Sequence, residues 1–226
     1  WSRNFLSPAN INIFVNSMAD DNDGVLISGQ YWDLGTNRTH GMVVRVGKTS
    51  AQLVWAKYYR SGGNTLGFGQ ILRLGNDFIV NSYNPTAILK IDGNGNIISE
   101  VALSGPGLNY GQQLAVDKNS DIVGINTPIT GLPHTMAVYK LDADFNEKWV
   151  RTYDQVPRNT SNSITAKNND IFISSVVQSG LPKAIYTISK LDSQGLLSTC
   201  PPSTFTIQKR SVTYTPVDFI NATALH

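Results

Sequence analysis

One short pattern returns four times along this chain, and it limits the fold more than any other feature. An apolar segment ends in a basic residue, a polar turn rich in Asp, Asn and Gly follows, and a second apolar segment comes after the turn. The basic residues are Arg45, Lys90, Lys140 and Lys190, so they lie 45, 50 and 50 residues apart. Apolar and polar residues that alternate on both sides of such a turn predict a β-hairpin.

A second set of positions marks the same period. Short apolar runs, each of the length that a buried strand needs, follow an aspartate at the end of a polar turn. These aspartates are Asp23, Asp77, Asp121 and Asp170, at steps of 54, 44 and 49 residues. No stretch of ten residues shows the apolar spacing of a helix, so the sequence predicts an all-β chain.

A period of about 40–50 residues with four strands in each repeat is typical of the blades of a β-propeller. We therefore predict a propeller of four-stranded antiparallel blades with about four complete repeats. Their approximate bounds are 10–60, 66–104, 110–154 and 160–199. Each blade would cover the apolar faces of its neighbours around a common axis.

The two ends of the chain do not fit a whole repeat. Residues 1–5 read Trp-Ser-Arg-Asn-Phe and match residues 55–59 and 149–153, which form the last strand of a repeat. We predict that residues 1–5 are the outer strand of another blade, which either closes the ring or belongs to a larger propeller. Residues 200–226 are predicted to be a tail or closing strands, because Pro201 and Pro202 cannot continue a central strand.

Composition excludes several classes of partner. Charged residues make up 15% of the chain and its formal net charge is +2, which is too weak to predict binding to nucleic acid. No run of 18 apolar residues exists, so no membrane insertion is expected. Cys200 is the only cysteine, which fits a reducing compartment or a secreted fold stabilised by the packing of its repeats.

The repeat resembles the propeller-like repeats of secreted and surface-attached bacterial proteins, among them large adhesin-like and motility-associated ones. The resemblance rests on the segment 23–29, on Lys-Leu-Asp at 140–142 with Trp at 149, and on Lys-Ile-Asp at 90–92. Two departures are the absence of Trp from the second and fourth repeats and Arg-Val-Gly at 45–47. The resemblance implies an extracellular or cell-surface protein with a scaffold, adhesion or binding role. It implies no catalytic residues.

Polar loops at one end of the repeats are the predicted contact surface for a protein or glycan partner. They are residues 33–40, 126–134 and 178–183. Candidate ligand-binding residues are Tyr31, Trp32, Tyr83 and His134, because aromatic side chains stack on sugars and contact proteins. Trp32 fits a packing role equally well.

Asp142, Asp144 and Asn146 alternate oxygen ligands as calcium loops do, so calcium is the one cofactor that the sequence suggests. The same residue types form tight turns, and the terminal bidentate Glu of a calcium loop is missing. No catalytic motif appears, so we expect a non-enzymatic module. The alternatives are a polysaccharide-acting enzyme of propeller fold and a subunit of an extracellular filament or assembly.

Overall fold

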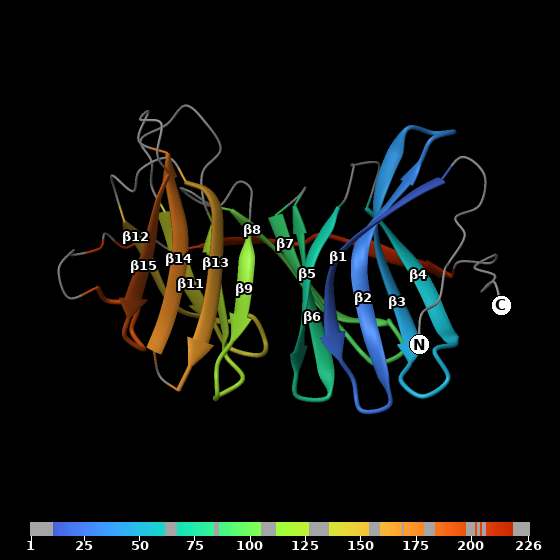
Figure 1. Ribbon diagram of the computed structural model, residues 1–226, viewed down its shortest axis with the longest axis horizontal. Coiled ribbons are helices and arrows are strands. Elements are labelled where there is room, and N and C mark those ends of the chain that lie inside the picture. The colour runs from blue at the N-terminus through green and yellow to red at the C-terminus, as the bar shows by residue number, and fades with distance from the viewer. Residues whose placement is uncertain are drawn as a thin grey trace. The chain divides into compact units, whose positions relative to one another are not determined.

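The computed structural model describes most of the chain, and it is β throughout. The residues described are 11–61, 67–83, 86–104, 112–126, 136–153, 159–168, 170–178, 184–197, 202, 204 and 207–218. Within these ranges every regular element is a strand and none is a helix, which confirms the all-β prediction. The strands form four antiparallel sheets (Figure 1).

Each sheet is built mainly from strands that follow one another in the chain. The first sheet has the order β1 (Ile11–Asp20), β2 (Gly24–Asp33), β3 (Arg38–Gly47), β4 (Leu53–Ser61) and β17 (Tyr214–Asp218). The second has β5 (Phe68–Leu74), β6 (Asp77–Tyr83), β7 (Thr86–Ile91), β8 (Ile97–Ser104) and β16 (Gln208–Arg210). The third has β9 (Gln113–Val116), β10 (Ile122–Asn126), β11 (Met136–Leu141) and β12 (Glu147–Tyr153), and the fourth has β13 (Asn159–Lys167), β14 (Asp170–Gln178) and β15 (Ala184–Leu191).

The sheets differ from the predicted blades in two places. The tail adds β17 to the free edge of β4 and β16 to the free edge of β8, so neither β4 nor β8 is the outermost strand. The fourth sheet has three strands among the described residues. Leu197, where we expected a fourth strand, forms an isolated bridge there. Pro201 and Pro202 follow within five residues, and proline has no N–H for a strand ladder.

The chain divides into two compact units. The first contains residues 1–102 and 211–226, and the second contains residues 103–210. The core of the first unit lies between the first and second sheets and includes Leu26, Tyr59, Phe68 and Leu89, all at 0% exposure. The core of the second unit joins the third and fourth sheets through residues such as Val123, Trp149, Ile173 and Leu191.

The two periodic anchors of the sequence meet as an ion pair in every repeat. The basic residue lies on the third strand, and the aspartate lies in or beside the turn between the first two strands. The pairs are Arg45–Asp23 at 2.5 Å, Lys90–Asp77 at 3.5 Å, Lys140–Asp121 at 3.2 Å and Lys190–Asp170 at 2.7 Å. The repeat therefore has a polar tie that fixes its first turn to its third strand.

The turn between the third and fourth strands is held by an aspartate in three of the repeats. One oxygen of Asp92 accepts the backbone N–H groups of Asn94 and Asn96, each at 2.8 Å. Asp142 and Asp192 make the same two bonds in their own turns. This Asx-turn chemistry explains why Asp follows the basic residue in these repeats.

The Trp-containing strand of one sheet contacts the turn of the next sheet in each unit. In the first unit, Trp55 Nε1 donates to the carbonyl of Gly93 at 3.0 Å and the Tyr59 hydroxyl donates to that of Gly95 at 2.8 Å. In the second unit, Trp149 Nε1 donates to Ser193 at 3.1 Å and the Tyr153 hydroxyl donates to Gly195. We call the Trp-x-basic-x-aromatic segment the docking motif and the turn that receives it the docking turn.

Glycine is needed in these docking turns for two reasons. Gly95 and Gly195 have φ angles of +73 and +72, in a backbone region that other residues rarely adopt. A Cβ would also lie 2.7 Å from Trp55 at Gly95 and 2.6 Å from Trp149 at Gly195. The indole ring thus lies directly on the backbone of the turn.

Candidate functional site

The two ends of each antiparallel sheet differ. One end has the short hydrogen-bonded turns described above, and the other has the connection between the second and third strands. In the first sheet that connection belongs to a long hairpin, since β2 and β3 have ten residues each while β6 and β7 have seven and six. Its tip is ordered by Asp33, which accepts the Gly35 N–H at 2.9 Å and the Thr36 hydroxyl at 2.8 Å.

Three rings gather on one face of this hairpin and of the neighbouring strand β4. Tyr31 on β2 stacks on His40 of β3, with ring centroids 5.8 Å apart and planes at 22°. Tyr58 of β4 lies 5.1 Å from Tyr31 and 5.6 Å from His40. We call Tyr31, His40 and Tyr58 the ring cluster. Register explains it: Tyr31 pairs with His40 and Met42 pairs with Tyr58, which places all of them on one face.

A cation borders the ring cluster. The guanidinium of the exposed Arg60 lies 5.0 Å from the centre of the Tyr58 ring and donates to the Tyr58 hydroxyl at 2.5 Å. An Arg in this position orients the phenol and adds a positive charge next to an aromatic surface. Tyr31 and Tyr58 are half-buried, so part of each side chain remains accessible.

His40 is the buried member of the ring cluster. Its exposure is 8%, and its Nδ1 has no hydrogen-bond partner among the residues that the structure describes. Burial, helped by the nearby Arg60, lowers the pKa of His40 below its usual value, so the imidazole is neutral at pH 7. Burial and then the charge of Asp33 raise the pKa of Tyr31. The ring cluster is therefore an aromatic surface with a neutral, buried imidazole beneath two half-buried phenols.

Three of the four predicted ligand-binding residues belong to the described part of the chain, and they lie on two sheets. Tyr31 belongs to the ring cluster, whereas Trp32, the next residue, points to the opposite face of the strand, and its Nε1 donates to Asn37 Oδ1 at 3.3 Å. Tyr83 is on the second sheet and packs over Gly69, where a Cβ would lie 2.3 Å from its hydroxyl oxygen. Burial raises the pKa of Tyr83. His134 lies outside the described residues.

Sequence reasoning did not include Tyr58 and Arg60 in the candidate site and included His40 only as the last residue of the polar loop 33–40. One signal was available: Tyr58 and Arg60 are two residues apart in a predicted strand, so their side chains share a face. What was missing was the register that places this face beside Tyr31 and His40. The neighbouring strands are set by the fold and not by local sequence.

The predicted calcium ligands lie in the third-to-fourth turn of the third repeat, and Asp142 already has donors there. Its Oδ1 accepts N–H groups of Asp144 and Asn146 at 2.9 and 2.7 Å, and its Oδ2 accepts the Asn146 side-chain N–H at 3.0 Å. Burial alone would raise the pKa of Asp142, but these hydrogen bonds lower it. The carboxylate thus acts as a turn cap, and calcium binding stays a prediction.

The described residues contain no group of three or more His, Cys, Asp or Glu side chains that could hold a metal ion. They also contain no helix with the length and apolar composition needed to cross a bilayer.

Comparison with known proteins does not assign the chain to a family. No family model matches it, and no curated protein matches it. Function must therefore be inferred from the site itself, because an all-β scaffold serves many activities.

Proposed function

We propose that this protein is a non-enzymatic glycan-binding module and that the ring cluster on the first sheet is its binding surface. The observation that carries the proposal is the convergence of Tyr31, His40 and Tyr58 on the long β2–β3 hairpin, next to Arg60. Binding residues are often found at the loop end of a rigid sheet, where this cluster lies.

The chemistry of the ring cluster suits a sugar. The apolar C–H face of a pyranose packs on an aromatic ring, while its hydroxyl groups need donors and acceptors nearby. The exposed Arg60 supplies N–H donors for such hydroxyl groups. The low net charge of +2 does not favour a nucleic acid.

We also propose that each repeat is a propeller blade and that the protein is exported or displayed at a cell surface. Support comes from the sheet order, which follows the chain, and from the same docking contact in both units. The resemblance to repeats of surface-attached bacterial proteins supports export. An experimental structure with the sheets stacked in two flat layers would overturn the blade assignment.

Titration calorimetry against a panel of neutral and acidic oligosaccharides tests glycan binding, with Tyr58→Ala as the informative variant. For a sugar that binds, we expect the variant to weaken affinity roughly three- to tenfold, the usual worth of one aromatic contact. Phe14→Ala is the matched control, because Phe14 is a 49% exposed aromatic on the same sheet outside the ring cluster.

Three outcomes would contradict the proposal. They are no binding by any sugar of the panel, equal affinity of Tyr58→Ala and the parent chain, and an equal loss in Phe14→Ala. Turnover of a bound glycan would instead favour the alternative of a polysaccharide-acting enzyme. A mass in solution of many copies would favour a subunit of a filament or assembly.

A further inference from the structure

The turn between β3 and β4 of the first repeat resembles the two docking turns. The backbone N–H of Ala51 donates to the carbonyl of Gly47, four residues earlier, at 3.0 Å, and that of Gly95 donates to the carbonyl of Asp92, three residues earlier, at 3.0 Å. Ala51 also has a positive φ of 52, which is uncommon for a residue with a side chain. Ala51 is therefore the counterpart of Gly95 and Gly195, on which Trp rings lie in the second and fourth repeats.

The face of the first sheet next to this turn is apolar and partly open. In the second sheet the corresponding residues, Phe78 and Val80, pack against the first sheet and are 0% exposed. The strand register shows that they correspond to Val25 and Ile27. In each sheet the two residues pair with the residues directly before and after the basic residue of the third strand. Val25 and Ile27 are only half-buried, and Val15 on β1 is 60% exposed.

The fourth sheet shows that this difference is not a matter of residue type. Ile171 and Ile173 hold the same register positions and are 2% and 1% exposed, because they pack against the third sheet. The first sheet thus presents the apolar surface of a receiving sheet, and among the described residues that surface is less covered than in the second and fourth sheets.

One segment of the chain carries the matching docking motif. Residues 1–5, which lie outside the described part, read Trp-Ser-Arg-Asn-Phe, with Trp, a basic residue and an aromatic at the spacing of Trp55–Tyr59 and Trp149–Tyr153. The distance along the chain also agrees. Trp149 precedes the first residue of β13 by ten positions, and Trp1 precedes the first residue of β1 by ten.

We propose that the Ala51 turn and the open face of the first sheet bind residues 1–5 of the same chain, with the Trp1 ring against Ala51. Arg3 then holds the position of Lys57 and Arg151, whose cations lie 5.8 and 5.6 Å from the neighbouring Trp rings. Phe5 has no hydroxyl, so this contact lacks the tyrosine hydrogen bond that the other two docking motifs make.

The Cβ of Ala51 limits how closely the Trp1 ring can approach the turn. A Cβ at Gly95 would lie 2.7 Å from Trp55, whereas ordinary carbon contacts begin near 3.5 Å. The Trp1 ring must therefore lie roughly 1 Å farther from the turn than Trp55 does. Replacing Ala51 with Gly removes this obstacle and relaxes the positive φ, so the ring moves closer without a loss of folding.

Fluorine NMR on the full chain labelled with 5-fluorotryptophan tests this inference without any glycan, so its failure is separate from failure of the proposed function. The chain has four Trp residues, and single Trp→Phe variants assign their signals. We expect the Trp1 signal, like those of the docked Trp55 and Trp149, to show a small H₂O/D₂O shift. Ala51→Gly should move the Trp1 signal and leave that of Trp149 in place.

Ala143→Gly is the matched control, because Ala143 lies in the equivalent turn of the third repeat but is not at the positive-φ position. It should leave the Trp1 signal unchanged. A Trp1 signal with the full H₂O/D₂O shift of the free amino acid, or one that ignores Ala51→Gly, would overturn the inference. A Trp1 signal that becomes solvent-exposed on dilution would assign the docking to a second copy of the chain and equally overturn it.

Discussion

At the scale of single residues, the backbone of the docking turns decides which side chains are allowed. The equivalent positions Ala51, Gly95, Phe145 and Gly195 have φ angles of 52, 73, 65 and 72. Strain alone does not exclude a side chain there, since Ala and Phe are present. Glycine stands at the two positions where the structure places a Trp ring on the turn, so the close approach of the ring explains the choice.

Gly195→Ala is expected to destabilise the protein more than a glycine substitution with the same backbone cost. Gly75 has a φ of +66 and nothing within 4 Å of a Cβ, whereas a Cβ at Gly195 would lie 2.6 Å from Trp149. We expect Gly75→Ala to cost about 1–2 kcal/mol of unfolding free energy. Gly195→Ala should cost about 1–3 kcal/mol more, because the Trp149 ring must move.

Urea unfolding followed by circular dichroism measures both changes. Equal losses in Gly75→Ala and Gly195→Ala would mean that the Trp149 ring yields freely and that the docking contact contributes little.

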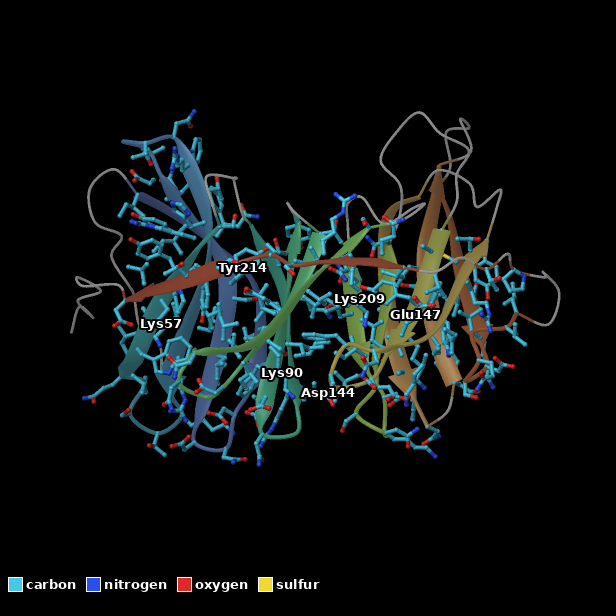
Figure 2. All side chains as sticks on the ribbon, turned by 180° about the vertical axis from the view of Figure 1, so that it is seen from behind. Lys57, Lys90, Asp144, Glu147, Lys209 and Tyr214 are labelled. Carbon is cyan, nitrogen blue, oxygen red and sulfur yellow. The ribbon has the colours of Figure 1, made fainter. Side chains whose placement is uncertain are left out.

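At the scale of elements, the tail and the ion pairs join segments that are distant in sequence. β17 completes the first sheet, and its Tyr214, 4% exposed, enters the core of the first unit (Figure 2). The Tyr214 N–H donates to Glu100 Oε2 at 3.2 Å, and burial raises the pKa of Glu100. Burial also raises the pKa of Tyr214 to about 12. In the second unit, the Ile207 N–H donates to Glu147 at 2.9 Å.

The ion pairs differ in burial from one repeat to another, which makes their energies predictable. Lys140 lies 2.7 Å from Asp117 and 3.2 Å from Asp121, with all three side chains at most 9% exposed. Lys190 and Asp170 are 60% and 37% exposed. We expect Lys140→Met to cost about 3 kcal/mol, because it leaves buried carboxylates short of a partner. Lys190→Met should cost at most about 1 kcal/mol.

The loss in Lys140→Met should depend on pH. Burial acts to raise the pKa of Asp117, but the bond from Lys140 and backbone N–H groups lower it below 3.8. A lowered folded pKa gives stability that is present above the unfolded pKa and is lost as pH falls through the folded value. Urea unfolding at pH 7 and at pH 3 should show the difference shrinking in acid, and a constant difference would contradict the assignment.

At the scale of the whole molecule, buried tyrosines limit stability in alkali. Burial raises the pKa of Tyr59 and of Tyr139 above the usual 10.0. A group whose folded pKa is raised contributes stability that is fully present below its unfolded pKa and is lost as pH rises through the folded value. Folding therefore opposes the ionisation of these phenols at high pH.

A spectrophotometric titration of the nine tyrosines should separate them into two sets. The accessible phenols are expected to ionise near pH 10, and the buried ones, Tyr59 and Tyr139 among them, only as circular dichroism reports unfolding above that pH. Urea added at pH 10.5 should bring the two sets together. A single smooth titration of all nine in the folded protein would contradict the burial of these side chains.

Much of the local structure was predictable from the sequence because it depends on neighbours along the chain. The period, the Asp-Asn-Gly turns and the apolar runs at 78–80 and 122–125 all rest on alternation and turn chemistry. The periodic basic residues and the periodic aspartates were visible in the sequence as well. Their pairing as ions was not, because the sequence alone leaves open the registers that bring Asp121 to Lys140.

The candidate site was predictable only in part. Tyr31 was proposed from its residue type, and the ring cluster contains it. His40 and Tyr58 join it through pairing of β2, β3 and β4, which aligns side chains 9 to 27 positions apart in the chain. Trp32 was proposed for the same reason as Tyr31, because it is aromatic. It nevertheless points to the other face of β2, since the side chains of adjacent residues in a strand alternate.

The sequence by itself determined that this chain is a β repeat of about fifty residues, because turns and strands are chosen by residues close together. Only the tertiary structure decided which strands meet. It added β17 to β4, left three strands in the described part of the fourth sheet and placed the Trp rings on glycine turns some forty residues away. Such contacts depend on burial and register over long separations, which no local pattern encodes.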